Sequence, residues 1–404
     1  MANKKIPYDV APIARDYSTP ASRRPVASKR SFSAGIFILA VLIFNIVLGV
    51  ITLSSIASNK NNNYMNITNN VVVNGADVAY ATSKAKMSSV CVAVDSRGTY
   101  SRTNLPTQKQ FFANTTERGS GTIYKIDKTE GVAYIITCNH VVSSARNNVF
   151  VLLYDADDPV YASVVGYSSS YDVAVLKVQD DQIKTTMCNQ ATLADSAFIA
   201  EGQTAIVIGN PLGAGFNATA GVISKTLTNY TTASGAKRGI QIDTPVNSGN
   251  SGGGLFDKNG NFVGVVQSKN DASSTDNIAF AVPGNLAVSI ADNVMTGRNL
   301  AYASSGYTVT TETIVKLIDG QYYKMSNVYV DSVSGVDAIS AGLAHGDRII
   351  SISYHGKTKD ITTDFSYEEI KFDLIVGDVL EYKVVRGNNT ITLTLNVTSV
   401  STST

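Results

Sequence analysis

A glycine-rich run beyond the midpoint of the chain surrounds one small hydroxyl, a side chain that can act as a nucleophile. Ser251 lies within VNSGNSGGGLF, which spans Val246–Phe256. Glycine adopts backbone conformations that other residues avoid and lets other atoms approach closely. Such a loop can expose a hydroxyl and direct backbone N–H groups at one point, as a nucleophile beside an anion hole requires. A plain tight turn has a similar composition, so other residues must decide between the two interpretations.

A serine nucleophile needs a base, and imidazole groups are scarce in this chain. Of three histidines, only His140 lies in the same region of the sequence as Ser251, at the end of the apolar run AYIITCNHVV. Strand ends are positions where a rigid scaffold presents reactive groups to a cleft. We therefore predict His140 as the base, with a half-buried structural histidine as the alternative. His345 and His355, near the C-terminus, are predicted to be surface residues.

A third group, a carboxylate, would hold the imidazole tautomer and stabilise its protonated form. Asp172 directly precedes the apolar run VAVLKV. An acid that borders such a strand can be partly buried, and a buried carboxylate needs a partner. An aspartate in an ordinary turn is the alternative. Five other aspartates lie in clustered polar loops and are weaker candidates, namely Asp155, Asp157, Asp158, Asp180 and Asp181.

The elements that must position these side chains are short strands. From about Lys84 to Val282 the chain consists of apolar runs rich in Val, Ile, Thr and Tyr, separated by turn residues. Many strands at short spacing predict an all-β barrel or sandwich pair. The dipeptide Asn259–Gly260 predicts a hairpin turn. One helix is expected in this region, from Asn285 to about Thr296.

Composition limits the partners and cofactors. A chain of 404 residues is expected to form two or three domains. Its net charge of +1 gives no case for nucleic-acid binding. Cys91, Cys138 and Cys188 are too few for a disulfide framework and lack the spacing of a zinc site, although one bridge stays possible. With few, scattered histidines, we expect no metal and no organic cofactor.

The N-terminal sixty residues predict a membrane anchor. Ser31–Ala57 is an uncharged, largely apolar stretch that follows a basic segment, 1–30. A helix of this length can cross a bilayer of ~30 Å, and the basic flank places the N-terminus in the cytoplasm. A cleaved signal peptide is the alternative, but its apolar region is usually shorter. The Asn-rich segment 58–83 is predicted to be a linker outside the membrane.

Three blocks of this sequence resemble a known family. TCNHVV, DVAVLKV and GNSGGGLF are similar to the catalytic blocks of the trypsin-like serine proteases of the HtrA (Deg) family. The segments GSGTIY, AGVISKT, IQIDTPV and NIAFAVPGN also match in order, so the resemblance covers roughly residues 85–295. It implies two six-stranded antiparallel β-barrels, as in chymotrypsin, with the active site between them.

The resemblance also implies the role of each site residue. Ser251 would attack the scissile carbonyl, His140 would act as general base and then general acid, and Asp172 would orient the imidazole. The backbone N–H groups of Gly249 and Ser251 would form an oxyanion hole, with Asn250 between them. Cys138 lies beside the histidine as an alternative nucleophile, but the complete serine set argues against it.

Specificity is expected from residues on both sides of the nucleophile. In this fold the pocket would be lined by Thr244, Pro245, Val246, Val265, Val266 and Gln267. Pro245 stands six residues before Ser251, where an acid would select Arg or Lys. The sequence therefore predicts a preference for a small or apolar side chain.

The last hundred residues resemble the PDZ module that follows HtrA proteases. AISAGLAHGDRIISI and the later SYEEIKFDLI carry this likeness, and a hairpin is expected around Gly387–Asn389. PDZ modules bind an extended peptide at a sheet edge. The candidate peptide-binding residues are Gly306, Tyr307, Thr308 and Val309.

Together these features predict a membrane-anchored, extracytoplasmic serine endopeptidase of a bacterium, which cleaves misfolded or exposed protein segments in quality control and stress response. The predicted parts are a cytoplasmic tail (1–30), a transmembrane helix (31–57), a linker (58–83), a protease domain (84–297) and a PDZ-like domain (298–404). A non-catalytic peptide-binding chaperone and a sensor protease with one specific partner are the alternatives. By resemblance we expect a homotrimer that binds protein or peptide substrates.

Overall fold

The computed structural model describes residues 75–232, 235–267, 278–296, 301–303, 306–398 and 400–402. The predicted transmembrane helix Ser31–Ala57 lies outside the described residues. Within these ranges every helix is too short or too polar to span a bilayer.

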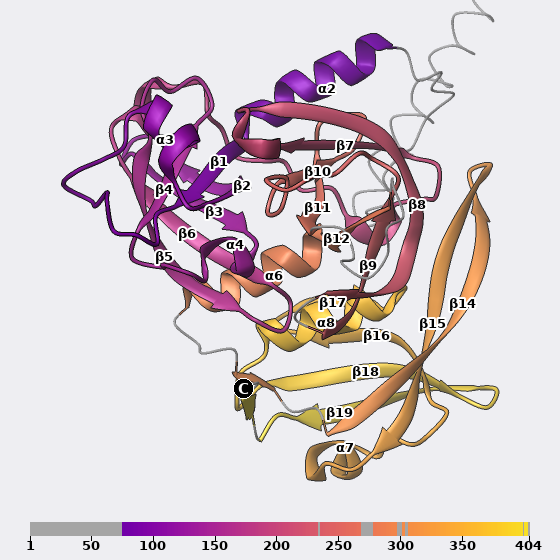
Figure 1. The fold of residues 1–404 in the computed structure, drawn as a ribbon. Coiled ribbons are helices and arrows are strands. Elements are labelled where there is room, and N and C mark those ends of the chain that lie inside the picture. The colour runs from indigo at the N-terminus through magenta and orange to yellow at the C-terminus, as the bar shows by residue number, and fades with distance from the viewer. Residues whose placement is uncertain are drawn as a thin grey trace, which may run out of the picture. The chain divides into compact units, whose positions relative to one another are not determined.

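Twelve strands close into two six-stranded antiparallel barrels, as the resemblance predicted (Figure 1). The first barrel has the strand order β1-β2-β3-β6-β5-β4. Its strands are β1 (Ser89–Val94), β2 (Glu117–Asp127), β3 (Val132–Thr137), β4 (Val149–Leu153), β5 (Val160–Ser168) and β6 (Val173–Gln179). Closure leaves no exposed sheet edge, because every strand has a partner on each side.

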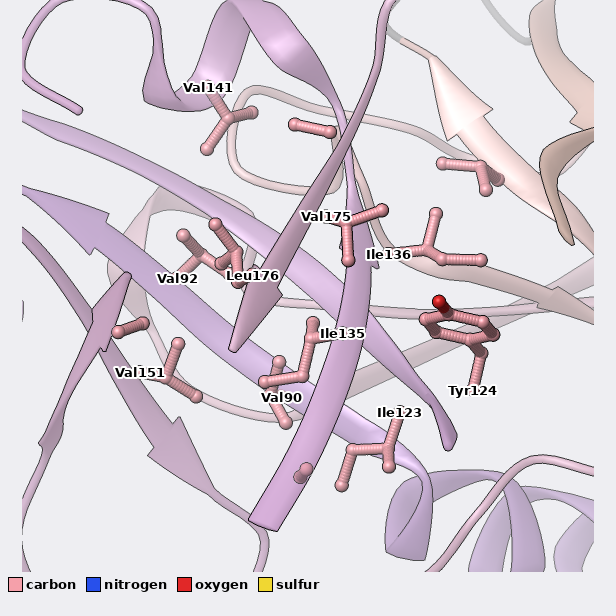
Figure 2. Packing of buried hydrophobic residues seen from close by; sticks show 14 of the residues in the cluster. Val90, Val92, Ile123, Tyr124, Ile135, Ile136, Val141, Val151, Val175 and Leu176 are labelled. Carbon is pink, nitrogen blue, oxygen red and sulfur yellow. The ribbon is translucent and has the colours of Figure 1, made fainter. Parts of the chain in front are cut away.

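The core of the first barrel consists of branched aliphatic side chains from all round the sheet. Figure 2 shows Val90 and Val92 of β1 grouped with side chains of the other strands. Among these are Ile123, Ile135, Val151 and Leu176, all of them fully buried. Burial of each such side chain contributes roughly 1.5–3 kcal/mol. This packing supplies the rigid base on which the loops between strands are held.

The second barrel has the order β10-β11-β12-β9-β8-β7. Its strands are β7 (Thr204–Gly209), β8 (Asn217–Thr232), β9 (Gly235–Ile242), β10 (Gly254–Phe256), β11 (Phe262–Gln267) and β12 (Ala279–Pro283). The predicted hairpin joins β10 to β11, and its turn is held by Asp257, whose Oδ1 accepts the N–H groups of Asn259 and Asn261, both at 2.8 Å. Gly260 has φ +68°, which favours glycine.

Helices connect and cover the strands of the protease region. They are α2 (Gly75–Met87), α3 (Gln108–Asn114), α4 (Asn139–Val142), α5 (Gln182–Thr185) and α6 (Gly284–Met295), with short 3₁₀ turns at Ser196–Phe198 and Pro211–Gly213. Helix α6 confirms the predicted helix. It packs Ile290 and Val294 into the core of the first barrel, where Gly166 of β5 leaves room for Val294.

Helix α2 corrects the predicted linker. It begins at Gly75, inside the segment 58–83, so the folded region starts earlier than expected. Ala81 and Ala85, one turn apart, are fully buried, and the Lys84 ammonium donates to Asn261 Oδ1 at 2.7 Å. The low complexity of this segment concealed Ala81, the buried residue that attaches its end to the protein.

The C-terminal region forms a module with its own core and a sheet of order β14-β15-β16-β18-β19, to which β17 adds on β16. Its strands are β13 (Ala301–Ala303), β14 (Tyr307–Ile318), β15 (Gln321–Val333), β16 (Arg348–Tyr354), β17 (Lys357–Asp360), β18 (Val379–Arg386), β19 (Asn389–Asn396) and β20 (Val400–Thr402), with helices α7 (Val336–Ala341) and α8 (Asp364–Asp373). The predicted hairpin at Gly387–Asn389 joins β18 to β19. His345 and His355 are exposed, as predicted.

The four candidate peptide-binding residues lie at the start of β14, an edge strand of this sheet. Gly306 has φ +67°, and its carbonyl accepts the N–H groups of Ser334 and Gly335. Tyr307 is buried and donates to the hydroxyl of Tyr382 at 3.1 Å. Burial raises the pKa of Tyr382 to about 12, so both phenols stay neutral. Thr308 and Val309 continue into the strand.

Candidate active site

The predicted base and acid are in direct contact. His140 lies in the one-turn helix α4, just after β3, and its Nδ1 is 2.6 Å from Asp172 Oδ2. The His140 backbone N–H donates to the other carboxylate oxygen at 2.8 Å. The Asp172 side chain is only 5% exposed, whereas the imidazole is 44% exposed. A buried carboxylate therefore fixes the ring from behind while its other face remains accessible.

Asp172 is held in an uncommon backbone conformation. It ends the turn between β5 and β6 with φ +55°, a region that L-residues other than Asn and Asp rarely adopt. Its carbonyl accepts the N–H of Asn139 at 3.2 Å. Backbone and side chain of Asp172 thus both bind the start of α4, which fixes the position of the imidazole.

A second layer of hydrogen bonds lies behind this turn. Gln267 donates from Nε2 to the carbonyl of Tyr171 at 2.9 Å, and its Oε1 accepts the hydroxyl of Tyr230 at 2.8 Å. The Tyr230 ring stacks on Phe280, with centroids 4.3 Å apart. Burial raises the pKa of the Tyr230 phenol, and nearby Cys138 and Asp172 add to the rise, so the hydroxyl remains a donor. Gln267, predicted as a pocket residue, bonds to the residue before Asp172.

The glycines around Ser251 are required by the path of the backbone. Gly249 has φ +100° and Gly252 has φ +83°. A Cβ on Gly252 would lie 2.3 Å from both the carbonyl oxygen of Ser120 and the hydroxyl oxygen of Thr137. Only glycine fits this position, so the loop can pass between the two barrels and present Ser251.

The hydrogen bonds of the loop leave two N–H groups for an anion. The carbonyls of Gly249, Asn250 and Ser251 accept bonds from Ser120 Oγ (2.7 Å), Gly253 N (2.9 Å) and Ser120 N (2.9 Å). The N–H of Asn250 donates to Asn247 at 3.0 Å. Within the part of the chain that the structure describes, the N–H groups of Gly249 and Ser251 have no recorded acceptor. These two are the donors predicted for the oxyanion hole.

Ser120 is a site residue that sequence reasoning missed. It lies in β2 of the first barrel, yet its N–H and its hydroxyl both bind carbonyls of the Ser251 loop, which belongs to the second. Its Oγ also accepts the N–H of Asn210 at 2.8 Å. The signal in the sequence was a small polar residue between two glycines in GSGTIY, a run that resembles the nucleophile loop itself.

Replacing Ser120 with alanine is expected to lower kcat/KM about 10- to 100-fold and to reduce the melting temperature. The change removes the 2.7 Å bond to the Gly249 carbonyl and the 2.8 Å bond from the Asn210 N–H, and leaves these two groups only their longer bond to each other, at 3.4 Å. A lost buried hydrogen bond costs about 1–3 kcal/mol. Steady-state peptide hydrolysis and calorimetry measure the two effects. Ser163→Ala, at an exposed position of β5, is the matched control. Wild-type kinetics in Ser120→Ala would show that the loop keeps its shape without this bond.

His140 and Ser251 line the same cavity, which has a volume of about 400 Å³. Its other lining residues are Thr116, Glu117, Arg118, Val141, Gly213, Ser248 and Gly249. One carboxylate and one guanidinium lie beside the catalytic groups, so the cavity is polar without a strong net charge. Such a surface suits a peptide backbone rather than a highly charged ligand.

The predicted specificity residues do not line this cavity. Val246 and Val266 pack in the core of the second barrel. Val265 belongs to the hydrophobic cluster that also contains the core residues of the first barrel. Thr244 is fully buried, whereas Pro245 is exposed and its carbonyl accepts a bond from Thr219. The backbone of Val266 binds the nucleophile loop, because its N–H donates to Gly253 and its carbonyl accepts from Gly252, both at 2.8 Å.

All three cysteines are buried and none is in a disulfide, so the bridge that composition left open does not form. The thiol of Cys138 lies 3.4 Å from the carbonyl oxygen of Val266. It is not among the residues that line the cavity. This placement favours Ser251 over Cys138 as the nucleophile.

The geometry supports covalent acyl transfer. The carboxylate of Asp172 accepts the proton at His140 Nδ1 and so leaves the opposite ring nitrogen, Nε2, free to take the proton of Ser251. As Ser251 attacks a carbonyl, the negative charge on its oxygen is met by the N–H groups of Gly249 and Ser251. His140 then returns the proton to the leaving amine, and water hydrolyses the acyl-enzyme by the same sequence.

Two closed barrels, with a serine and a histidine–aspartate pair around one cavity, are typical of a trypsin-like serine peptidase. A family model for a trypsin-like peptidase domain matches residues 119–265. The Serine protease Do-like HtrA of Lactococcus lactis subsp. cremoris is 32% identical over 303 residues, which cover 70% of this chain and 71% of that protein. The chain belongs to the HtrA family of serine proteases and is a serine endopeptidase.

A second relative agrees with this assignment, and a solved structure shares the fold. The Serine protease Do-like HtrA of Bacillus subtilis is 34% identical over 294 residues, which cover 69% of this chain and 63% of that protein. A solved structure of the HtrA-type protease AlgW, a variant with a tripeptide, is similar in fold, with a TM-score of 0.50 and 24% identity over 81% of this chain and 98% of that one.

Proposed function

We propose that this protein is a membrane-anchored, extracytoplasmic endopeptidase that cleaves misfolded or exposed protein segments. The observation that carries the proposal is the arrangement of Ser251 and His140 in one cavity of about 400 Å³, whose lining includes one carboxylate and one guanidinium and therefore has no strong net charge. A protease cleaves a protein only where the backbone opens locally. A cavity without a strong charge would accept many such segments.

The anchoring part of the proposal rests on the sequence. Ser31–Ala57 is uncharged and long enough to cross a bilayer, and the basic flank precedes it. The catalytic region follows the anchor and would lie outside the cytoplasm of a bacterial cell. Removal of residues 1–57 is expected to move the peptidase from the membrane fraction to the soluble fraction, and retention in the membrane would contradict a single N-terminal anchor.

The C-terminal module supports a role in peptide binding or regulation. Strand β14 forms an edge of its sheet and begins with the predicted residues Gly306–Val309. An edge strand can pair with an extended peptide, as in PDZ modules. We propose a PDZ-like function for this module, and a homotrimer for the whole protein, in line with the sequence resemblance.

The substrate preference can be tested with one substrate protein, lysozyme, in its folded and its unfolded state. Wild-type enzyme is expected to degrade reduced and alkylated lysozyme at least about tenfold faster than native, disulfide-bonded lysozyme, because only the former exposes its backbone. Ser251→Ala should degrade neither. Equal rates for both forms would contradict the preference for unfolded segments. A protein that binds a serine-directed fluorophosphonate but degrades neither form would instead be a protease for one specific partner.

A further inference from the structure

Three potential metal ligands, one of them the imidazole of His140, lie close together at the ends of two strands. Cys138, His140 and Asp172 each offer one ligand atom, and these atoms lie within 4.8 Å of one another. Two of the three residues, Cys138 and Asp172, are almost completely buried. Within the described ranges no other group of His, Cys, Asp and Glu shows this arrangement.

The strand pairing fixes these positions. Cys138 follows the last residue of β3, and Asp172 precedes the first residue of β6, the neighbouring strand. Thr137 pairs with Ala174, so the end of β3 and the start of β6 lie side by side. Helix α4 then carries His140 back over Asp172. The three residues therefore lie directly at the ends of two paired strands of the first barrel.

The donor set suits a borderline or soft divalent cation. Zn²⁺ binds thiolate sulfur at about 2.3 Å and imidazole nitrogen or carboxylate oxygen at about 2.0–2.2 Å, in tetrahedral geometry. In such a site the nitrogen and oxygen ligands are about 3.4 Å apart, whereas His140 Nδ1 and Asp172 Oδ2 are 2.6 Å apart. Entry of the metal would separate this pair by less than an ångström, and the exposed imidazole can make that movement.

We infer that Cys138, His140 and Asp172 form an inhibitory site for Zn²⁺ or Cd²⁺, in which the metal switches off the peptidase. On binding, the Cys138 thiol releases its proton to solvent. The metal replaces the proton on His140 Nδ1, and that imidazole proton moves to Nε2. One proton is therefore released for each metal bound. An imidazole that carries its proton on Nε2 cannot accept the proton of Ser251, so acylation stops.

Cadmium reports binding without any need for activity. In the full-length Ser251→Ala protein, Cd²⁺ is expected to produce a saturable thiolate-to-metal charge-transfer absorption with one ion per chain. In active protein, Zn²⁺ and Cd²⁺ should abolish peptide hydrolysis, and a chelator should restore it. In Cys138→Ser, the absorption should disappear and the inhibitory concentration should rise by more than about tenfold, because one ligand is lost.

The other two buried thiols provide matched controls. Cys91→Ser and Cys188→Ser should keep both the absorption and the inhibition, since neither thiol lies in the cluster. Metal inhibition that is equal in wild-type and Cys138→Ser protein would overturn the proposal, as would a charge-transfer absorption that depends on Cys91 or Cys188. If Cys138→Ser fails to fold, absence of the absorption from the Ser251→Ala protein alone would reject the site.

Discussion

Replacing Ser251 with alanine is expected to lower kcat/KM for peptide hydrolysis by about 10⁴-fold or more, with the fold intact. In the proposed mechanism the Ser251 hydroxyl is the attacking group, and alanine carries no group that could replace it. The contact between the loop and Ser120 uses the backbone carbonyl of Ser251, so the substitution leaves it in place. Residual catalysis should come from the oxyanion hole and from binding alone.

Two readouts separate this chemical effect from misfolding. Labelling by a fluorophosphonate should be lost in Ser251→Ala. Its melting temperature should stay within a degree or two of wild type, because the hydrogen bond between Ser251 and Ser120 is made by the backbone and is kept. Ser163→Ala, which alters an exposed serine, should keep full labelling. Labelling that persists in Ser251→Ala would identify another serine as the nucleophile and would exclude the proposed triad.

Replacing Asp172 with asparagine is expected to reduce kcat by about 10⁴-fold, with a much smaller effect on KM. The carboxylate accepts both the backbone N–H and the Nδ1 proton of His140. An amide has only one acceptor oxygen. If that oxygen keeps the backbone bond, the amide N–H₂ faces Nδ1 and forces the imidazole proton onto Nε2. The ring is then in the tautomer that cannot take a proton from Ser251.

Nitrogen-15 NMR of the imidazole provides a direct test of this tautomer shift. Wild type should show the proton on Nδ1, and Asp172→Asn should show it on Nε2. Asp181→Asn is the control, because the Asp181 side chain is 93% exposed and lies away from the cavity. A loss of activity below about tenfold, or an unchanged tautomer, would mean that Asp172 serves only to hold the turn.

The candidate triad could be proposed from the sequence because each member lies in a local sequence context that restricts its role. Ser251 is surrounded by glycines, His140 is the one histidine of the β-rich region, and Asp172 borders a buried strand. The structure brings His140 and Asp172 into contact and places His140 and Ser251 in one cavity. These inferences depend on residue type and order along the chain, which the sequence contains.

Residues whose role depends on contacts between barrels could not be predicted in the same way. Ser120 binds the Ser251 loop across more than a hundred residues of sequence. The two glycines around Ser120 indicate a close backbone approach but not which segment approaches it. In β11 all six residues are buried, so alternation could not show which of Val265, Val266 and Gln267 faces a substrate. The long hairpin of β14 and β15 was missed although Asp319–Gly320, with φ of +49° and +79°, is a typical hairpin turn.

The bonds from Ser120 to the nucleophile loop connect catalysis to the seam between the two halves of the protease. The carbonyls of Gly249 and Ser251 accept hydrogen bonds from Ser120 of β2, and these bonds hold the backbone of the two residues whose N–H groups are the predicted oxyanion-hole donors. A small shift of one barrel relative to the other would displace this backbone and abolish stabilisation of the oxyanion. This loss would occur before either core exposed its side chains to water. Turnover is therefore a more sensitive gauge of the docking of the two halves than any measure of global unfolding.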